Sequence, residues 1–407
     1  KLVDTLTVSE NIFIGQPPMT GRGTVDWKKL HRDARELLDS IHADIDERAI
    51  VGKLSIARQQ MVEVCKALSH KAEIIIMDEP SATLTDKELT MLFQILRNLK
   101  SRGITVIYIS HRMEEVFEIS DRVTVLRDGQ HIHTGDIREL DRRRLIAMMV
   151  GRELENEYPK EFVGRGEPIL EVKNLNRPGV LKNISLTLHA GEVLCVSGLV
   201  GSGRTEFART VFGADRGKDQ TGEIWIRGKR IEIRSVQDAM RAGIALIPED
   251  RKRQGLVLGM SVRENISMAS IRRVMRGLRI SRKLENALAK EFIQSLRIMT
   301  PDQQREVRNL SGGNQQKVVI AKWLATNADI LILDEPTRGV DVGAKAEIYK
   351  LLNGFTAQGK GVIMISSEMP EVLGMCDRVV VFRDGAINGE FTRDEVTQEK
   401  LLDRAIR

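Results

Sequence analysis

The sequence has few cysteines, few aromatic residues and no long apolar run. Only 3 of its 407 residues are cysteines, and Cys65, Cys195 and Cys376 include no pair at the spacing of a metal site or a redox motif. This usage is typical of a reducing compartment, so we expect a cytosolic protein. No stretch approaches the roughly 18 apolar residues that cross a bilayer, and no signal-like leader opens the chain. If the protein works at a membrane, we expect partner subunits to hold it there.

Neither sign of charge dominates the sequence. Lys and Arg number 63 against 57 Asp and Glu, which gives a formal net charge of +6. This near balance argues against a dedicated nucleic-acid binder. The basic clusters at residues 142–144 and 251–253 are more simply interpreted as solvated faces, so we expect no nucleic-acid partner.

An internal repeat of domain size is present. LSIARQQMVEVCKALSHKAEIIIMDEPSATLTD, which begins at Leu54, aligns with LSGGNQQKVVIAKWLATNADILILDEPTRGVD, which begins at Leu310, at an offset of 256 (310 − 54). Further upstream, TVSENI from Thr7 matches SVRENI from Ser261 at an offset of 254. We therefore expect two copies of one domain.

The two copies differ in length. The second continues upstream to Ile169 through a glycine loop at Gly198, whereas the first begins at Lys1. The offset places the first copy's own loop before Lys1, so we expect the first domain to be incomplete at its front. Residues 153–168 are polar and broken by Gly and Pro, as in a linker. The expected domains are 1–152, an incomplete first copy, and 169–407, a complete second copy.

Apolar runs and helical patterns alternate in the second copy. The runs VLCVSG, IALIP, ILILDEP, GVIMISS and RVVVF are rich in β-branched residues. Such alternation predicts an α/β domain with a largely parallel sheet. Residues 261–308 are instead polar and helix-patterned, and we expect them to form a helical insert.

The stretch GLVGSGRT at residues 198–205 fits a phosphate-binding loop, except that Arg204 replaces the usual lysine. Glycines there let backbone amides approach a phosphate, and Thr205 would supply a hydroxyl to Mg²⁺. Arginine keeps the positive charge but replaces a compact ammonium with a planar fork, so we expect nucleotide binding with slower hydrolysis. The alternative is a plain glycine turn between strand and helix. The residues expected to bind the nucleotide are Gly198, Gly201, Ser202, Gly203, Arg204 and Thr205.

Two apolar strands end in an Asp-Glu pair. IIIMDEP contains Asp78 and Glu79, and LILDEP contains Asp334 and Glu335. In a phosphoryl-transfer site the aspartate would hold Mg²⁺, and the glutamate would orient or deprotonate the attacking water. A solvated Asp-Glu pair is common at strand ends, but two copies at one offset favour the catalytic interpretation.

The segment NLSGGNQQK precedes the second Asp-Glu pair and begins a helix. Ser311, Gly312 and Gly313 leave backbone amides bare at the helix start, where they can face a phosphate. An N-capped helix after a turn explains these residues alone equally well. The position between a phosphate loop and a carboxylate strand favours the phosphate interpretation.

Together, LSGGN, the paired DEP strands, GVD at residues 339–341 and YISHRMEEV with His111 resemble the ATP-binding cassette (ABC) ATPases over essentially the whole chain. PEDRKRQGLVLGMSVRENI, DEPTRGVDVGAK and SSEMPEVLGMCDR are similar to the fused two-cassette ATPases of bacterial monosaccharide importers of the ribose type. The resemblance implies two tandem P-loop NTPase domains, with ATP and Mg²⁺ as cofactors.

The same resemblance implies partners and a location. The expected partners are membrane permease subunits and an extracytoplasmic sugar-binding protein. The chain would lie peripherally at the cytoplasmic face of the bacterial inner membrane. Residues 10–15 (ENIFIG) and 263–270 (RENISMAS) would contact the permease.

In that family, two cassettes pack head to tail, and each ATP lies between the phosphate loop of one and the LSGGQ-like segment of the other. One implied site joins the Arg204 loop, Asp334 and Glu335 to LSIARQ of the first copy. The other joins Asp78, Glu79 and His111 to residues 311–313 and would need a phosphate loop from the first copy.

Departures from the family pattern gather in the Arg204 site. Glu249 replaces the usual glutamine, Ser367 takes the position of His111, and residues 56–58 are Ile-Ala-Arg instead of Gly-Gly-Asn. We expect this site mainly to bind nucleotide, while Glu79 carries hydrolysis. Because the loop that would pair with Glu79 precedes Lys1, we expect this chain alone to hydrolyse ATP poorly.

Two other classes of function stay open from the sequence. The first is a soluble twin-cassette protein that acts on ribosomes or DNA, which usually brings a long charged linker, a coiled coil or zinc-binding cysteines. The second is a non-catalytic nucleotide-sensing module, against which Glu79, His111 and LSGGN argue. Ribose is one candidate cargo among pentoses, hexoses and related small molecules.

Overall fold

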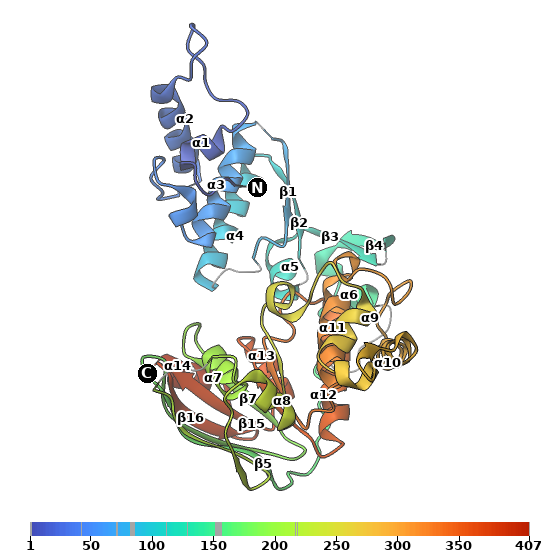
Figure 1. The fold of residues 1–407 in the computed structure, drawn as a ribbon. Helices are drawn as coiled ribbons and strands as arrows, with labels where there is room; N and C mark the ends of the chain where they lie inside the picture. Colours follow the sequence, from blue (N-terminus) through green and yellow to red (C-terminus); the bar gives the residue numbers. More distant parts are fainter. Residues whose placement is uncertain are drawn as a thin grey trace. The chain divides into compact units, whose positions relative to one another are not determined.

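The computed structural model describes residues 2–41, 43–70, 72–81, 86–110, 112–127, 129–150, 157–215, 217 and 219–406. The chain divides into two compact units, Lys1–Glu153 (unit 1) and Leu154–Arg407 (unit 2), each with its own hydrophobic core (Figure 1). Among these residues no helix combines the length and the apolar character needed to cross a membrane.

Unit 2 is built on a six-stranded sheet in the order β10-β13-β14-β7-β15-β16. The first five strands run parallel, and β16 pairs antiparallel with β15. Four strands are fully buried, as their unbroken apolar sequences require. The strands are β7 (Val193–Gly198), β10 (Ile244–Ile247), β13 (Ile330–Asp334), β14 (Gly361–Ile365), β15 (Arg378–Arg383) and β16 (Ala386–Thr392).

A second, antiparallel sheet in unit 2 was not expected from the sequence. Its order is β6-β5-β8-β9, and the strands are β5 (Pro168–Arg177), β6 (Leu181–His189), β8 (Thr221–Ile226) and β9 (Lys229–Ile231). Register shifts interrupt the pairing of β5 with both of its neighbours, so the alternation of its side chains is broken. The expectation of a largely parallel sheet therefore holds for the six-stranded sheet, while the unit as a whole is mixed.

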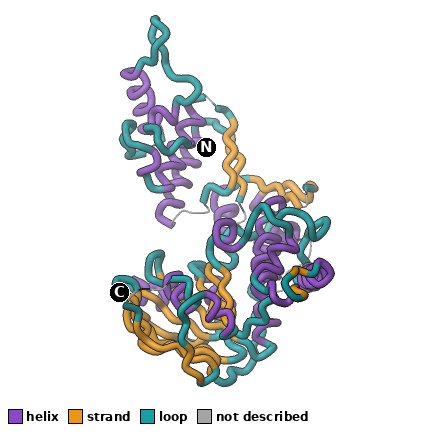
Figure 2. The backbone as a smooth tube through the Cα atoms, viewed as in Figure 1, coloured by secondary structure: helices purple, strands orange, loops and turns teal. Residues whose placement is uncertain are grey.

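Helices alternate with the strands of the larger sheet along the chain, and the expected helical insert lies between β10 and β13. Figure 2 distinguishes the helices, in purple, from the strands, in orange. The insert contains two α-helices but also a short two-stranded hairpin, and η3 (Arg251–Gly255) precedes the insert. Its elements are α9 (Val262–Met268), η4 (Ile271–Val274), β11 (Met275–Arg276), β12 (Arg279–Ile280), α10 (Arg282–Ser295) and η5 (Val307–Asn309). The other helices are α7 (Arg204–Val211), α8 (Val236–Arg241), α11 (Gly312–Leu324), α12 (Val342–Thr356), α13 (Met369–Met375) and α14 (Gln398–Ile406).

Unit 1 combines helices with two small sheets. Strand β1 (Ile74–Asp78) pairs in parallel with β2 (Thr105–Ile109), and β3 (Arg122–Arg127) pairs antiparallel with β4 (Gln130–Asp136). The helices are α1 (Val8–Ile12), α2 (Trp27–Ser40), η1 (Val51–Lys53), α3 (Ile56–Ser69), α4 (Asp86–Ser101), α5 (Met113–Ile119), η2 (Ile137–Glu139) and α6 (Arg142–Val150).

The sequence repeat is also a structural repeat. Each α-helix and β-strand of unit 1 from α3 to α6 begins 256 residues before its equivalent in unit 2, as β1 at residue 74 and β13 at residue 330 illustrate. Upstream, α1 and α9 both begin with a capping box, formed by Thr7 with Glu10 and by Ser261 with Glu264. The two units therefore share one order of elements over this stretch.

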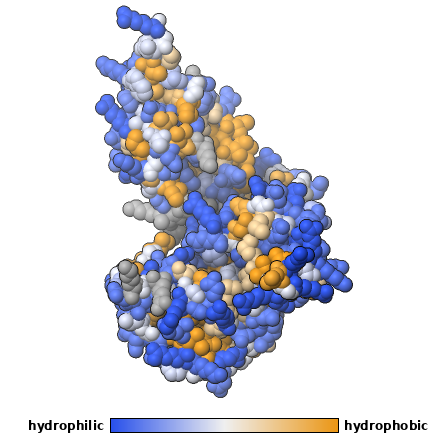
Figure 3. All heavy atoms as spheres, viewed as in Figure 1, coloured by the Kyte–Doolittle hydropathy of each residue, from blue (hydrophilic) through white to orange (hydrophobic). Residues whose placement is uncertain are grey.

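The two units differ in how their strands are covered. In unit 2, β7 lies between β14 and β15, whereas in the described part of unit 1 no strand lies between β2 and β3. Apolar side chains of β1 and β2 are exposed, and Figure 3 shows them gathered over these strands. Ile76 is 65% exposed, while its equivalent Ile332 is 0% exposed. The other exposed residues are Ile74, Ile107, Ile109 and, on β3, Leu126.

Candidate functional site

The predicted phosphate loop connects β7 to α7, as the motif requires. Gly198 has a φ of 144°, and a Cβ there would lie 2.4 Å from the carbonyl oxygen of Phe382. Gly203 has a φ of 100° and caps the start of α7, where a Cβ would lie 3.2 Å from the Cα of Gly385. Both positions therefore require glycine for backbone reasons.

Arg204 is the first residue of α7, and it is only 7% exposed. Its Nη1 donates a hydrogen bond of 3.0 Å to the carbonyl oxygen of Ser366, and its Nη2 lies 3.8 Å from Oε1 of Glu335. The guanidinium therefore joins the phosphate loop to the ends of β13 and β14.

Asp334 and Thr205, two of the residues predicted to bind Mg²⁺, contact each other. Asp334 is 3% exposed, burial raises its pKa to about 6, and the Thr205 hydroxyl is hydrogen bonded to it. Oδ1 of Asp334 has no hydrogen-bond partner among the described residues. A hydroxyl beside an unpaired carboxylate oxygen is a donor set that suits Mg²⁺, so the residues fit this ion. No cluster of three or more His, Cys, Asp or Glu side chains suited to a metal occurs in the described ranges.

Glu335 lies just beyond β13 in the left-handed region, with a φ of 48°. Its N–H donates to the carbonyl oxygen of Ile365 at 2.9 Å. Burial raises the pKa of its carboxyl group, and Arg204 together with hydrogen bonds from Ser367 opposes that shift. Ser367, at the position equivalent to His111, thus contacts the carboxylate.

The equivalent residue of unit 1 has the same backbone geometry. Glu79 has a φ of 46°, and its N–H donates to the carbonyl oxygen of Ile109 at 2.9 Å. Asp78 ends β1, as Asp334 ends β13. His111 lies outside the described residues, so its predicted place beside Glu79 stays a prediction.

The expected phosphate-facing segment begins α11. Ser311 is the N-cap residue, but its hydroxyl does not cap the helix and instead accepts a 2.9 Å hydrogen bond from Nδ2 of Asn314. A Cβ on Gly312 would lie 3.0 Å from the carbonyl oxygen of Gly339, and one on Gly313 would lie 2.8 Å from the Cβ of Ala344. Packing within unit 2 therefore requires these glycines, a reason that neither the phosphate interpretation nor the helix-cap alternative had included.

The matching segment of unit 1 is built differently. Helix α3 begins at Ile56, which is 51% exposed, and the Ser55 side chain caps the helix by accepting from the N–H of Arg58 at 3.4 Å. Here the serine hydroxyl satisfies the helix start and is less available to a ligand.

Sequence reasoning missed one group of contacts beside the site. Arg251 donates to the carbonyl oxygens of Arg338 at 2.8 Å and of Gly339 at 3.1 Å, and Arg338 forms an ion pair with Glu249. The loop after β10 is thereby tied to the loop after β13. Arg251 is part-exposed, as expected of a solvated face, but it also binds backbone within the unit. The unusual Glu249 was a signal for the ion pair with Arg338.

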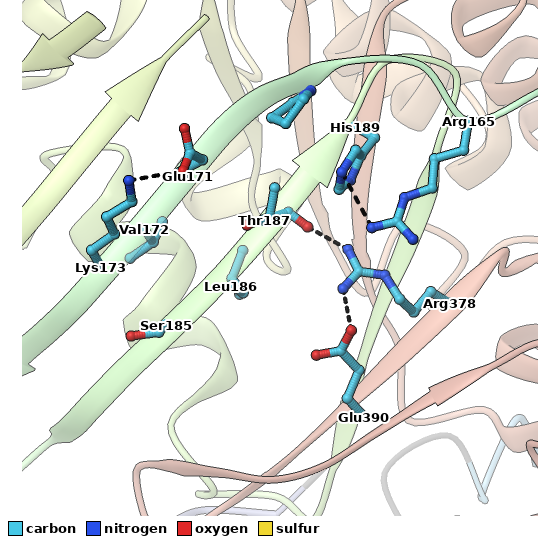
Figure 4. Close-up of a pocket in the computed structure, with 11 residues that line it drawn as sticks. Arg165, Glu171, Val172, Lys173, Ser185, Leu186, Thr187, His189, Arg378 and Glu390 are labelled. Carbon is cyan, nitrogen blue, oxygen red and sulfur yellow. Dashed lines mark hydrogen bonds and ion pairs between the residues drawn. The ribbon is translucent and has the colours of Figure 1, made fainter. Parts of the chain in front are cut away.

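A separate pocket of about 550 Å³ lies between the antiparallel sheet and the β15–β16 hairpin (Figure 4). None of the expected site residues lines it. Arg378 donates to Glu192, Glu390 and the carbonyl oxygen of Thr187, and His189 contacts both Arg165 and Glu192. Because these charged groups already pair with one another, we interpret the pocket as a structural contact between the two sheets and not as a ligand site.

Comparisons with known proteins agree with this geometry. A protein-family model described as ABC transporter matches residues 181–338. The chain is 49% identical to a ribose import ATP-binding protein of Rubrobacter xylanophilus, over 98% of this chain and 80% of that protein. It is 47% identical to a ribose import ATP-binding protein of Clostridium perfringens, over 100% and 81%. It is also 47% identical to a xylose import ATP-binding protein of Thermoanaerobacter pseudethanolicus, over 98% and 80%.

Solved structures show the same fold. A nucleotide-free ATP-binding cassette from an ABC transporter matches with a TM-score of 0.50 at 22% identity, over 59% of this chain and 100% of that chain. The ADP conformation of an ATP-binding cassette matches with a TM-score of 0.50 at 22% identity, over 59% and 99%. With relatives at 47–49% identity over nearly its whole length, the chain belongs to the ATP-binding proteins of ABC importers.

Proposed function

We propose that this chain is the ATP-hydrolysing subunit of a bacterial importer for a monosaccharide such as ribose or xylose. The observation that carries the proposal is the identity of 47–49%, over at least 98% of the chain, to relatives named for ribose and xylose import. The phosphate loop, the buried Asp334 and the neighbouring Glu335 supply the chemistry that such a subunit needs.

The chain carries two cassettes in this proposal. Residues 1–152 belong to the first, residues 153–168 link the two, and residues 169–407 belong to the second. The common offset of 256 from α3 to α6 and the matching backbone at Glu79 and Glu335 support a shared fold in both units. As in the family, the cassettes would pair head to tail and bind ATP between them.

The second cassette's own loop binds one nucleotide. Residues 198–205 would surround the phosphates, and Thr205 and Asp334 would hold Mg²⁺. When bound, the metal ion neutralises charge on the phosphate oxygens. Arg204 already contacts the Ser366 carbonyl and lies near Glu335, so Glu335 is less free to accept a proton from water. This site therefore binds nucleotide and turns over slowly.

The other site carries hydrolysis. It combines Asp78, Glu79 and His111 of the first cassette with Ser311, Gly312 and Gly313 of the second. The support is geometric, because Glu79 has the backbone conformation of Glu335 and follows the equivalent strand. Asp78 would hold the second Mg²⁺, and Glu79 would activate water.

The partners are membrane permease subunits and an extracytoplasmic sugar-binding protein, and the chain sits peripherally at the cytoplasmic face of the inner membrane. Residues 10–15 and 263–270 would contact the permease. Their helices are largely packed inside their own units, which leaves residues such as Met268, 37% exposed, to make the contact. No nucleic acid takes part.

Glu79→Gln and Glu335→Gln test the proposal in the complete importer, reconstituted in proteoliposomes with its permease and sugar-binding protein. We expect Glu79→Gln to reduce sugar-stimulated ATP hydrolysis by ~10²-fold or more and Glu335→Gln to retain most of it. The reverse order would overturn the assignment of hydrolysis to Glu79. ATP hydrolysis that neither sugar nor permease changes would instead favour a soluble twin-cassette ATPase.

A further inference from the structure

In each unit, one of the buried glutamates contacts the segment that follows the Asp-Glu strand. Glu115 in α5 is 1% exposed, and Glu371 in α13 is 0% exposed. The two positions are 256 residues apart (371 − 115). Since a carboxylate is costly to bury without partners, its contacts should reveal what keeps it there.

In unit 1, three hydroxyl groups donate to one oxygen of this carboxylate. The distances to Oε2 of Glu115 are 2.6 Å from Oγ of Ser81, 2.8 Å from the hydroxyl of Tyr108 and 3.1 Å from Oγ of Ser110. Ser81 follows Glu79 by two residues, and Ser110 immediately precedes His111. The carboxylate therefore ties together the segments that follow β1 and β2.

Unit 2 repeats this arrangement. Thr337, at the position of Ser81, donates to Oε1 of Glu371 at 2.9 Å, and Ser366, at the position of Ser110, donates to its Oε2. The third donor is Tyr349 at 2.9 Å. It comes from α12, whereas Tyr108 lies on β2. The two units therefore share two bridging hydroxyls at equivalent positions, and a tyrosine from a different element completes each set of three donors.

We propose that Glu115 is a positioning residue, which fixes the segment bearing Glu79 against the segment bearing His111 and so sets the rate of ATP hydrolysis. The inference rests on the proposed function, because it takes Glu79 as the hydrolytic carboxylate. Glu371 holds the equivalent segments of unit 2, where Ser366 receives Arg204 and Ser367 contacts Glu335. In unit 2 the same bridge lies beside the proposed site that binds nucleotide and hydrolyses it slowly.

The charged residues near Glu115 and Glu371 differ, as expected if one bridge serves the hydrolysing site and the other serves the site that mainly binds nucleotide. Nη1 of Arg112 lies 3.0 Å from Oε1 of Glu115 and supplies a counter-charge. The equivalent residue in unit 2 is Glu368, an acid that pairs with Lys345 at 2.6 Å. The bridge of unit 1 therefore has one more contact, from a cation that unit 2 does not carry at this position.

Replacement by glutamine keeps the side-chain shape but changes the hydrogen bonding. Glutamine keeps only one acceptor oxygen. If that oxygen faces the three hydroxyls, the NH₂ donor faces Nη1 of Arg112, and if it faces Arg112, the NH₂ donor faces the hydroxyls. Either orientation should weaken the bridge. A shift of about 1 Å between catalytic segments costs on the order of 100-fold in rate.

The test compares Glu115→Gln with its matched control, Glu371→Gln, in the complete importer. Thermal unfolding, kcat and KM for ATP are measured for both. We expect Glu115→Gln to lower kcat by at least ~10-fold with KM for ATP within about twofold. For Glu371→Gln we expect a loss of kcat below about threefold. Equal loss of kcat in the two variants, or no loss in Glu115→Gln, would overturn the inference.

Ser81→Ala and Ser110→Ala test the inference even if Glu115→Gln does not fold. Each variant removes one bridge and leaves the carboxylate in place, and each should lower kcat.

Glu79→Gln is assayed in parallel, to separate failure of this inference from failure of the proposed function. If Glu79→Gln retains turnover, the proposed assignment of hydrolysis fails. If only Glu79→Gln abolishes turnover while the Glu115, Ser81 and Ser110 variants do not reduce it, the inference about Glu115 fails alone.

Discussion

Arg204 shows how one residue changes the character of a site. A lysine at the end of the loop would present a compact ammonium to the phosphates, whereas the guanidinium is planar and can bind two groups at once. Here it binds the Ser366 carbonyl and lies 3.8 Å from Glu335. The positive charge is retained, but part of its hydrogen bonding is used within the protein.

Arg204→Ala should weaken Mg-ATP binding to this 407-residue chain. A hydrogen bond to a charged group is worth about 1.5–3 kcal/mol, which corresponds to a ~10- to 100-fold rise in Kd. Isothermal titration calorimetry measures the change. Arg209→Ala is the control, because Arg209 also lies in α7 but pairs with Asp215 at 2.7 Å. Equal affinities in the two variants would contradict a role for Arg204 in phosphate binding.

Glu371 makes stability depend on pH. Burial raises its pKa from 4.5 to about 7, so the folded state holds a proton that the unfolded chain releases at lower pH. The stability linked to that proton is complete below pH 4.5 and is lost as the pH rises to about 7.

Compared with Glu371→Gln, the unmodified chain should therefore lose up to about 3 kcal/mol of unfolding free energy between pH 4.5 and 7. Urea unfolding of both proteins across this range measures the difference. Profiles that stay parallel would show that Glu371 is ionised throughout.

At the scale of elements, α11 depends on glycine where it meets the start of α12. In Gly313→Ala the new Cβ would lie 2.8 Å from the Cβ of Ala344, so the helix must move. Even after the gain in helix propensity, we expect a net loss of about 1–2 kcal/mol.

Gly354→Ala is the matched control for this prediction. Gly354 lies in α12, is exposed, and has no atom within 4 Å of an added Cβ. We expect this variant to gain about 0.5–1 kcal/mol. Chemical denaturation of both variants gives the comparison, and two changes of the same sign would contradict it.

Elements with a strong local signal were predictable from the sequence. The buried strands β7, β10, β13, β14 and β15 follow directly from unbroken β-branched runs. The antiparallel sheet was missed because β5 pairs with both β6 and β8 through register shifts, so no clean period of two survives in its sequence. The hairpin β11–β12 was missed because it is very short and lies within a helical pattern.

The parts of the candidate site that consist of one contiguous sequence motif were predictable. The contacts between segments that are distant in the sequence were not. The phosphate loop and the Asp-Glu pairs are contiguous motifs. The bridges of Glu115 and Glu371 and the contacts of Arg251 depend on which loops and strands become neighbours. The residues that make these contacts lie far apart in the sequence, so no local pattern indicates that they meet.

At the scale of the whole molecule, the two units bury equivalent strands to different extents. Ile332→Thr should cost about 2–4 kcal/mol, because it leaves a cavity and buries a hydroxyl. Ile76→Thr, at the equivalent but exposed position, should cost less than about 0.5 kcal/mol. Urea unfolding of this chain measures both costs. A comparable loss for Ile76→Thr would mean that the β1–β2 face is covered in solution.

The backbone at Glu79 and Glu335 has a consequence for how this molecule can change. A side chain held at a φ of 46° or 48° costs on the order of 1 kcal/mol, and glycine or asparagine would relieve it. A laboratory selection that rewarded heat resistance alone would drift toward those residues at both positions. Under the proposed function, these replacements would remove the carboxylates assigned to water activation, so ATP hydrolysis has to be screened in every round of the selection.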